Sequence, residues 1–290
     1  MPSRIPSAWL TSSKPCVVQT VRREGRAHWR DLPWRNVDDP YAVLVSEVML
    51  QQTQVKRVLD YWPRWLALFP TLDALAMADT SLVLELWQGL GYNRRALALK
   101  RCAQICSDEL DGQLPVDEKA LRDLPGIGPA TAAGVRAFAH NLPGVYLETN
   151  VRTVFLHELF PSSQDVSDKD LVPLVRDTCP SDDARAWYYA LLDYGAHLKA
   201  TLPNPSRRSK HHSHQSKFEG SRRQKRAELL RIVLGGGHVT LAEASRLLDA
   251  EEKRRGRPAV DPELVRSLLA QMGDEGFFAF DPETGECRVL

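Results

Sequence analysis

The sequence predicts a chain that is all-α through about its first two thirds and ends in a small α+β domain. Apolar residues recur at helical spacing up to about residue 200, where strand signals are nearly absent. The composition then changes to a basic stretch over residues 199–231. Beyond it, helical segments are followed by apolar alternation around a Pro-Glu-Thr-Gly turn, which indicates a terminal β-hairpin. We therefore expect domains at 1–205 and 223–290, joined by a basic linker at 206–222.

The overall composition is that of a globular protein with a balanced charge. Hydrophobic residues make up 43% of the chain and charged residues 26%, and the formal net charge is +1. No apolar run approaches the roughly 18 residues of a membrane span, and the N-terminal residues lack the apolar core of a signal peptide. The five cysteines are scattered without a pattern, as is usual in a reducing compartment. We therefore expect a cytoplasmic protein.

The stretch from Leu121 to Asn150 carries the clearest local pattern. A short amphipathic helix is followed by the tight turn Gly126-Ile127-Gly128, and Pro129 then opens an Ala-rich helix. The exposed backbone N–H groups of such a turn, together with a helix N-terminus, suit a phosphate, so Gly126 and Gly128 are candidate binding residues. The alternative is an ordinary helical hairpin, which is the commoner meaning of a single Gly-x-Gly between helices.

Two glutamates are candidates for acid chemistry. Glu47 lies in the apolar run VLVSEVML of a helix that we expect to begin at Asp38-Asp39-Pro40 and to continue through Trp62. A carboxyl held among apolar residues has a raised pKa, as a general acid near neutral pH requires, although a solvent-facing glutamate is the simpler alternative. Glu148 precedes Asn150, the expected N-cap of the next helix, whose dipole should keep Glu148 ionised.

Two short clusters supply side chains that suit contact with an opened nucleic-acid duplex. After Glu47 come amides that can bond to base edges or fill the gap left by an extruded base, namely Gln51, Gln52 and Gln54. Their simpler interpretation is a neutral polar helix end. The segment Gly89-Leu90-Gly91-Tyr92-Asn93 should form a tight turn. We expect it to present Leu90 and Tyr92 as wedges, with Arg94 and Arg95 beside them to hold phosphates.

The basic stretch contains only two acids over residues 199–231, Glu219 and Glu228. A segment of this composition can lie along a polyanion, and its candidate contacts are Arg207, Arg208 and Lys210. A solvated linker is the alternative. The histidines beside it come without a cluster of cysteines or carboxylates, so we expect no metal site at His211, His212 and His214.

The final segment, 223–290, has the order helix, short strand, helix, helix and hairpin that is typical of a winged helix. Its third helix has Arg266 as its one basic residue, among the acids Asp261, Glu263, Asp274 and Glu275. Such a helix is poorly suited to reading the major groove of DNA. We expect it to contact a nucleic-acid backbone or another protein surface.

Four ordered motifs, covering roughly residues 29–200, resemble the helix-hairpin-helix (HhH-GPD) DNA glycosylases, and among them the MutY-type adenine glycosylases. They are LPWR (32–35), SEVMLQQTQV (46–55), GLGYNRRA (89–96) and LPGIGPATA (124–132). The resemblance implies a two-lobed all-α glycosylase domain with the DNA and the flipped base at the cleft between the lobes. It also implies a catalytic acid at Glu47, a second catalytic acid at Glu148, a base pocket with Trp34, Arg35 and Asn150, and duplex intrusion by Gln51, Gln52 and Tyr92.

The chain departs from that family pattern at four places. Glu148 stands where the family has an aspartate, and Ala130 stands where bifunctional members have a Schiff-base lysine, so no lyase activity is expected. The cysteines that hold the family's iron–sulfur cluster are missing after residue 198, so we expect no cofactor except a monovalent cation at the hairpin. The winged-helix-like segment replaces a Nudix-like domain.

The resemblance thus implies a monofunctional DNA glycosylase of base excision repair, working as a nucleoid-associated monomer on double-stranded DNA with a mismatched or damaged base. Adenine opposite guanine or 8-oxoguanine is the expected target, because an acid at Glu47 suits a leaving purine. The alternatives are removal of thymine or uracil from a mismatch, removal of hypoxanthine, and a non-catalytic DNA-binding protein that kept the fold. The two acids argue against the last of these.

Overall fold

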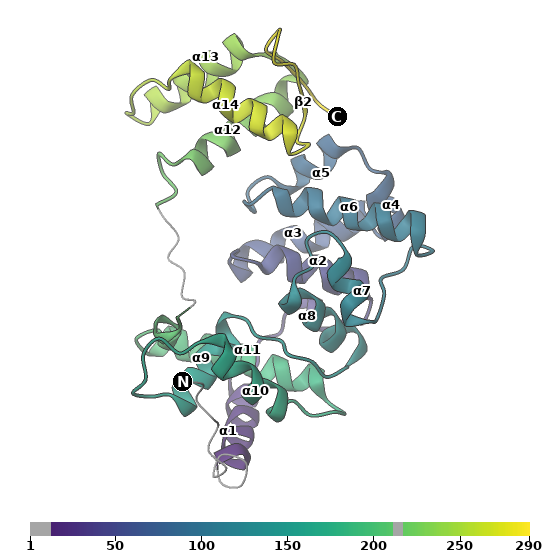
Figure 1. Ribbon diagram of the computed structural model, residues 1–290, viewed down its shortest axis with the longest axis vertical. Coiled ribbons are helices and arrows are strands. Elements are labelled where there is room, and N and C mark those ends of the chain that lie inside the picture. Colours follow the sequence, from purple (N-terminus) through teal and green to yellow (C-terminus); the bar gives the residue numbers. More distant parts are fainter. Residues whose placement is uncertain (1–12, 211–216) are drawn as a thin grey trace. The chain divides into compact units, whose positions relative to one another are not determined.

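The computed structural model describes residues 13–210 and 217–290, so the three histidines of the basic stretch lie outside the described residues (Figure 1). The chain forms two compact units, each built from two separate segments. Unit 1 combines Met1–Val48 with Leu114–His214, and unit 2 combines Met49–Gln113 with Gln215–Leu290. Each candidate residue therefore belongs to one of two separately packed bodies.

Unit 1 is helical and is organised around its longest helix, α11, which packs against α1, α8 and α9. Small residues allow close approach: a Cβ on Gly195 would lie 2.3 Å from the backbone oxygen of Asn150, and a Cβ on Gly25 would lie 2.4 Å from the Cβ of Ala190. The elements are α1 (Lys14–Ala27), η2 (Pro33–Arg35), α2 (Pro40–Leu50), α7 (Glu118–Asp123), α8 (Pro129–His140), α9 (Thr149–Leu159), α10 (Asp168–Thr178), α11 (Ala184–Thr201) and η3 (Pro205–Arg208).

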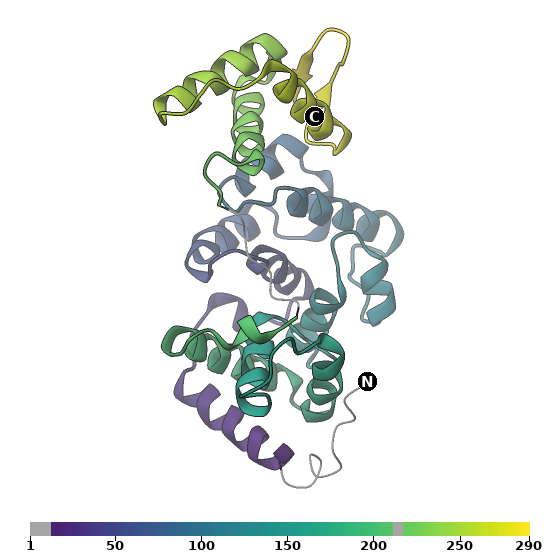
Figure 2. The ribbon, with the colours of Figure 1, turned by 60° about the vertical axis from the view of Figure 1, so that its left-hand side comes forward.

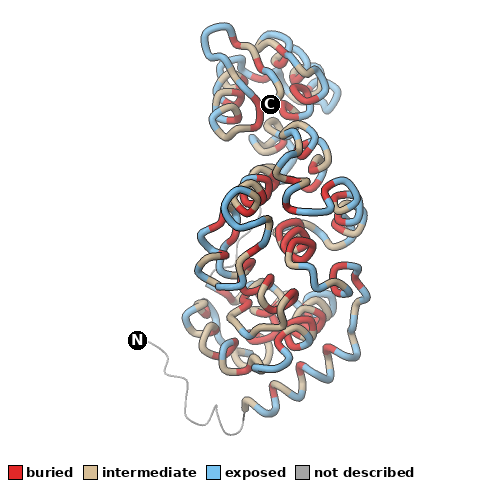
Figure 3. The backbone as a smooth tube through the Cα atoms, turned by 90° about the vertical axis from the view of Figure 1, so that its right-hand side faces the viewer, coloured by how far each residue is buried: buried red, intermediate tan, exposed pale blue. Residues whose placement is uncertain are grey.

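Helix α1 shows how the sequence pattern produces this packing. Its buried residues Val17, Val21 and Gly25 recur every four positions, so they form one stripe along the helix (Figure 3). The stripe faces α11, where the missing side chain of Gly25 lets the two backbones meet. The apolar stripe thus fixes this N-terminal helix to the body of unit 1.

Unit 2 combines a helical layer with the C-terminal domain, whose helices and hairpin are visible in Figure 2. The core of the helical layer is aromatic: the Trp65 ring contacts Phe69 and Trp87 edge to face, with centroids 5.0 and 5.3 Å apart. The elements are α3 (Val55–Leu68), α4 (Leu72–Met77), α5 (Thr80–Trp87), α6 (Arg94–Glu109), α12 (Arg222–Gly236), β1 (His238–Thr240), α13 (Leu241–Arg254), α14 (Pro262–Asp274), β2 (Ala279–Phe280) and β3 (Glu286–Arg288).

The C-terminal domain has the predicted winged-helix order of three helices, a short strand and a hairpin. The three strands form one antiparallel sheet in the order β1-β3-β2. Its register pairs His238 with Arg288 and Phe280 with Cys287. The predicted fold class, an all-α body followed by a small α+β domain, is confirmed. None of the helices in the described ranges has both the length and the apolar character needed to cross a lipid bilayer.

The predicted helix from Pro40 through Trp62 was wrong in one respect. It ends at Leu50, because Gln52 adopts a φ of 55° and a new helix begins at Val55. Elsewhere, Pro33–Arg35 forms a 3-10 turn. Helix α13 reaches Arg254, supported by i,i+3 and i,i+4 ion pairs of Glu251 with Arg254 and Arg255.

Candidate active site

Glu47 lies on α2 of unit 1, where its side chain is half-buried among apolar neighbours. Its neighbours on the helix are buried apolar residues, Val43, Leu44 and Val48, each 4% exposed or less. On the facing helix α8, a Cβ on Gly134 would lie 2.4 Å from Glu47 Oε2, so only glycine leaves room for the carboxyl there. Burial raises the pKa of Glu47 to about 8, and the neighbouring Glu148 charge adds to the rise. Glu47 is therefore protonated at neutral pH, as predicted.

The Tyr146 side chain lies beside the Glu47 carboxyl, and its phenol partly opposes the rise in the pKa of Glu47. The sequence-based interpretation assigned Tyr146 no role. One signal was present, because Val145, Tyr146, Leu147 and Glu148 form an extended segment in which side chains alternate between two faces. Tyr146 and Glu148 therefore share the face that is turned toward Glu47.

Glu148 is the N-cap of α9. Its Oε1 accepts hydrogen bonds from the backbone N–H groups of Asn150 at 2.7 Å and Val151 at 3.0 Å. The prediction that Asn150 is the N-cap was wrong, because the helix begins one residue earlier, at Thr149. The carboxyl itself, and not only its charge, is thus fixed by the helix N-terminus.

The prediction that the helix N-terminus keeps Glu148 ionised stays a prediction, because opposing effects act on this carboxyl. Burial raises its pKa, and this outweighs the two N–H donors and the nearby charges of Lys199 and Arg152. Two backbone N–H groups and the charges of Lys199 and Arg152 favour the ionised form of Glu148. A charge on Glu148 in turn raises the pKa of Glu47.

Asn150 lies beside Glu148, as the predicted base pocket requires. Its Oδ1 accepts a hydrogen bond from Lys199 Nζ at 3.0 Å, and its Nδ2 is 3.5 Å from Glu148 Oε2. The close contact between Gly195 and the Asn150 backbone holds this turn of α9 against α11. The structure therefore brings three predicted residues together inside unit 1: Glu47, Glu148 and Asn150.

Arg35, a predicted base-pocket residue, is buried, and both of its terminal nitrogens are hydrogen-bonded within the protein, while its Nε has no partner among the described residues. Its guanidinium donates to both oxygens of Asp193 on α11, at 2.7 and 2.8 Å. The same group is stacked between the rings of Trp29 and Tyr189, 4.6 and 4.5 Å from their centroids. Trp34 is also buried, at 5% exposure. Both residues are therefore packed inside unit 1. In this conformation Arg35 contacts Asp193, Trp29 and Tyr189 and is not placed to contact a base.

The predicted hairpin is formed by α7 and α8. Gly126 has a φ of 78°, which glycine accommodates at little cost, while Gly128 is extended and is the N-cap of α8. Both glycines are exposed, and no side chain caps the first turn of α8. This leaves the helix N-terminus open to an anion, as the phosphate-binding interpretation requires.

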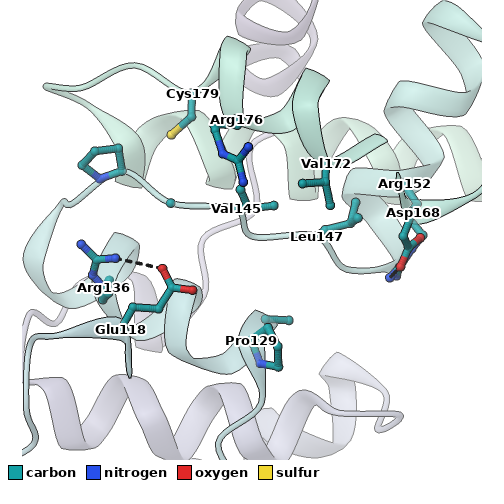
Figure 4. Close-up of a pocket in the computed structure, with 13 residues that line it drawn as sticks. Glu118, Pro129, Arg136, Val145, Leu147, Arg152, Asp168, Val172, Arg176 and Cys179 are labelled. Carbon is teal, nitrogen blue, oxygen red and sulfur yellow. Dashed lines mark hydrogen bonds and ion pairs between the residues drawn. The ribbon is translucent and has the colours of Figure 1, made fainter. Parts of the chain in front are cut away.

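A cavity of about 640 Å³ lies beside this N-terminus, against Pro129 and Ala130 (Figure 4). Val145 and Leu147 line it, so the extended segment faces the cavity on one side and Glu47 on the other. Cationic side chains also line the cavity: Arg136, Arg152 and Arg176. The two acids are absent from its lining, so it is a neighbour of the catalytic candidates and does not contain them.

Unit 2 carries the predicted duplex-contacting side chains. Gln52 and Gln54 are exposed, and Gln51 is half-buried. In the glycine turn, Tyr92 is 41% exposed and has a φ of 49°. Leu90 is only 3% exposed, so the prediction that it projects as a wedge was wrong for this conformation. Tyr92 and Gln52 are therefore the better candidates for intrusion.

The two arginines after this turn have protein partners. Arg94 is bidentate with Glu275 of the C-terminal domain, at 2.5 and 2.7 Å, and Glu275 also accepts from Arg226 at 2.6 Å. Arg95 donates to the backbone oxygens of Met49, Gln51, Leu90 and Gly91, so it holds the loops together. The prediction that Arg95 binds phosphate was wrong. Arg94 can bind a phosphate only if it first releases the Glu275 carboxylate.

The basic stretch is partly structural. Arg208 donates to the backbone oxygens of Leu156 at 3.0 Å and Phe160 at 2.8 Å, and to that of Pro161, at and just beyond the end of α9. Its predicted role as a DNA contact is therefore replaced by that of a clamp on α9. Arg207 and Lys210 are exposed and keep their predicted role.

The cysteines present do not fit the family's iron–sulfur cluster. All five are free and lie on separate elements except Cys102 and Cys106, both buried in α6. The segment from Leu202 to Lys210, which follows α11, has no cysteine. Within the parts of the chain that the structure describes, no three His, Cys, Asp or Glu side chains gather as a metal site would need. In this chain Arg208 ties the segment to the end of α9 through hydrogen bonds.

Comparisons with known proteins agree with this geometry. Residues 45–176 match the family described as HhH-GPD superfamily base excision DNA repair protein. The chain is 34% identical over 276 residues to an adenine DNA glycosylase of Mycolicibacterium smegmatis, covering 88% of this chain and 94% of that protein. It is 45% identical over 130 residues to an adenine DNA glycosylase of Mycobacterium tuberculosis, which covers 44% of this chain and 42% of that protein.

Solved structures show the same fold. A thermostable thymine-DNA glycosylase aligns with a TM-score of 0.60 at 23% identity, covering 68% of this chain and 92% of the other. An endonuclease III bound non-covalently to DNA aligns with a TM-score of 0.57 at 18% identity, covering 66% and 89%. At these identities the likeness concerns the arrangement of helices alone.

Proposed function

The chain belongs to the HhH-GPD superfamily of base excision DNA repair proteins, and on that basis we propose that it is a monofunctional DNA glycosylase that removes adenine from a mismatched pair. The observation that carries the proposal is the pair of acids: Glu47 is protonated at neutral pH, and Glu148 is fixed at a helix N-terminus. The relative that matches along 94% of its length is an adenine DNA glycosylase, which supports adenine as the target.

Binding would use the features that face outward. The open N-terminus of α8 and the exposed turn at Gly126 and Gly128 suit a backbone phosphate. Removal of a base from a duplex requires that it be flipped out, and the exposed Gln52 and Tyr92 are suited to occupy the gap. Double-stranded DNA containing a mispaired adenine, opposite guanine or 8-oxoguanine, is the proposed partner.

The chemistry follows from the different environments of the two carboxyls. Glu47 donates its proton to a ring nitrogen of adenine, the bond between the sugar and the base breaks, and the electron pair leaves with the base. The Glu148 carboxylate stabilises the cationic sugar that remains. Water then adds to the sugar and releases a proton, which restores the protonated Glu47. The products are free adenine and an abasic site, with both DNA strands intact.

The reaction should stop at the abasic site, since Ala130 offers no amine where a lyase would carry its lysine. We predict that borohydride traps no covalent protein–DNA adduct. Introducing the amine with Ala130→Lys is the matched control, because a trapped adduct from that variant shows that the assay can detect one. A strong adduct from the parent protein would mean that another lysine performs this chemistry.

We also propose that this protein holds no iron–sulfur cluster, so the purified protein should contain no stoichiometric iron. A monomeric state, a place at the nucleoid and a monovalent cation at the hairpin remain predictions from the family resemblance.

A panel of duplexes tests the function directly. Single-turnover excision is measured for adenine opposite guanine, 8-oxoguanine and cytosine, for thymine and uracil opposite guanine, and for hypoxanthine. We expect adenine to be released and Glu47→Gln to abolish its release while keeping duplex affinity. Preferential release of thymine or uracil would replace adenine as the substrate. Tight binding without release of any base would identify a non-catalytic DNA-binding protein.

A further inference from the structure

We propose that Tyr146 is a positioning residue for Glu47, and that its phenol fixes the carboxyl for proton delivery to the leaving base. The inference rests on the proposed glycosylase function. It starts from a contact that the sequence did not reveal: the Tyr146 side chain is 6% exposed, and its ring edge and the Glu47 carboxyl come together beside Gly134.

The Tyr146 ring is held by other rings, so the phenol cannot easily move away from the acid. Phe138 of α8 lies edge to face with it at 5.1 Å, and Tyr188 of α11 does so at 5.3 Å. The backbone is fixed as well: the Tyr146 N–H donates to the Tyr188 hydroxyl at 3.2 Å, and that hydroxyl donates to the backbone oxygen of Gly144. Two helices thus determine where the phenol stands.

Helix α8 leaves a gap at the place where the two side chains meet. A Cβ on Gly134 would lie 2.4 Å from Glu47 Oε2 and 2.9 Å from Tyr146 Cε2. Glycine in a helix interior lowers helix stability by about 1 kcal/mol relative to alanine. A glycine at this position is therefore explained by the Glu47–Tyr146 contact and not by the needs of the helix.

The contact has a chemical consequence for the acid. Burial raises the pKa of Tyr146 well above its ordinary value, so its hydroxyl stays protonated and can donate. A phenol that donates to one carboxyl oxygen leaves the acidic proton on the other oxygen, and it stabilises the carboxylate that forms when that proton leaves. Tyr146 therefore favours the state that Glu47 reaches during proton transfer.

The other groups that face Glu47 do not substitute for this bond. Glu148 comes from the same extended segment, and its charge raises the pKa of Glu47. Tyr189 of α11 interacts with the Glu47 charge through space, whereas the Tyr146 phenol favours the ionised form of Glu47. On α2 the flanking residues are Val48 and Ser46, whose hydroxyl donates to the backbone oxygen of Val43, and on α8 the facing residue is Gly134. Loss of the Tyr146 hydroxyl should consequently raise the pKa of Glu47 further.

The test compares Tyr146→Phe with a matched control. Tyr194 of α11 also donates its hydroxyl to a glutamate, Glu158, so Tyr194→Phe removes the same type of bond elsewhere in unit 1. Single-turnover excision is measured over a pH series that spans the pKa of Glu47. We expect Tyr146→Phe to lower the rate about tenfold and to move the alkaline decline to higher pH, with duplex affinity unchanged. Equal rates and equal pH profiles for the two variants would overturn the inference.

A second measurement needs no substrate. NMR titration of protein labelled with ¹³C at the glutamate carboxyls follows Glu47, whose signal is assigned by its loss in Glu47→Gln. The Glu47 titration should move upward in Tyr146→Phe and stay in place in Tyr194→Phe. If it moves while no duplex loses a base, the proposed function fails and the Tyr146–Glu47 contact stands. If adenine is excised and the titration does not move, the inference about Tyr146 fails alone.

A further variant approaches the same contact from α8. Gly134→Ala places a methyl group against the Glu47 carboxyl and the Tyr146 ring, while alanine favours the helix itself. We expect a helical, folded protein that has lost at least about tenfold in excision rate. Excision at the parent rate by folded Gly134→Ala would show that the enclosure of Glu47 and Tyr146 is not needed.

Discussion

A carboxyl that delivers a proton to a base at neutral pH must hold that proton until the base arrives, and Glu47 does so through burial. Its pKa is raised to about 8, so the acid is protonated below that pH and ionised above it. Burial also raises the pKa of Glu148, but there the N–H groups of Asn150 and Val151 oppose the rise. The division of labour between the two acids thus comes from backbone donors and not from residue type.

We predict that the excision rate falls above about pH 8, because the general acid Glu47 acts in its protonated form, and that it also falls on the acid side, where Glu148 takes up a proton and loses its charge. Glu47→Gln keeps the shape of the side chain but has no proton to donate, so the rate should fall by roughly 10²- to 10⁴-fold at neutral pH. Single-turnover kinetics measure both effects. Glu85→Gln is the control, because Glu85 is an exposed glutamate of α5. A parent-like rate for Glu47→Gln would exclude Glu47 as the acid.

Glu148 offers a way to separate catalysis from helix capping. Glu148→Gln keeps an oxygen that can accept from the N–H groups of Asn150 and Val151, so its thermal stability should stay close to that of the parent. Its excision rate should fall because the negative charge is gone. Glu148→Ala should lose the rate and also about 1 kcal/mol of stability, the usual effect of removing an N-cap. If Glu148→Gln excises the base at the parent rate, Glu148 serves only as the N-cap of α9 and takes no part in catalysis.

At the scale of the element, local patterns predicted the helices well and their interruptions poorly. The hairpin around Gly126 could be predicted because a Gly-Ile-Gly turn followed by proline is a local signal. The break between α2 and α3 could not: Arg95 holds the backbone oxygen of Gln51 from 44 residues away, and no local pattern encodes that bond. Tyr146 was missed for the same reason, since its partner Glu47 is on a distant element.

Arg208 shows how charge alone misleads. In the sequence it is one of many basic residues, yet in the structure its guanidinium donates to backbone oxygens at the end of α9, including that of Phe160, 48 residues away. We predict that Arg208→Ala lowers stability by about 1–3 kcal/mol and leaves the salt dependence of DNA binding unchanged. Arg207→Ala should do the reverse. Thermal denaturation and binding isotherms at several salt concentrations distinguish the two, and a flattened salt dependence in Arg208→Ala would restore it as a phosphate contact.

At the scale of the whole molecule, the C-terminal domain is tied to the glycine turn within unit 2. Arg223 donates to the Tyr92 hydroxyl at 3.0 Å, and Glu275 pairs with Arg94 and Arg226. Arg94 is largely exposed, so the free energy of this ion pair is small, on the order of 1 kcal/mol or less. A phosphate can therefore displace the carboxylate without great loss.

We predict that Glu275→Gln tightens duplex binding, because it removes a carboxylate that competes with phosphate for Arg94 and Arg226. The slope of log K against log salt should become steeper by about 0.9 for each additional phosphate that the protein neutralises. Glu283→Gln, at an exposed position of the terminal hairpin, serves as the control for the change in net charge. Equal slopes for the two variants would mean that the pairing of Arg94 has no influence on DNA binding.

The contact between α1 and α11 has a consequence for how the chain is made. Arg30, which follows α1, and Arg35 both pair with Asp193, and Arg30 is separated from that aspartate by 163 residues. During synthesis the two arginines and the apolar stripe of α1 are therefore made before their partners on α11, and residues 49–113 of unit 2 are made in between. Unit 1 can close only after α11 leaves the ribosome, and contacts between distant segments form slowly. A nascent chain arrested before Asp193 should thus bind chaperones through its N-terminal helix, and one arrested well beyond Thr201 should release them.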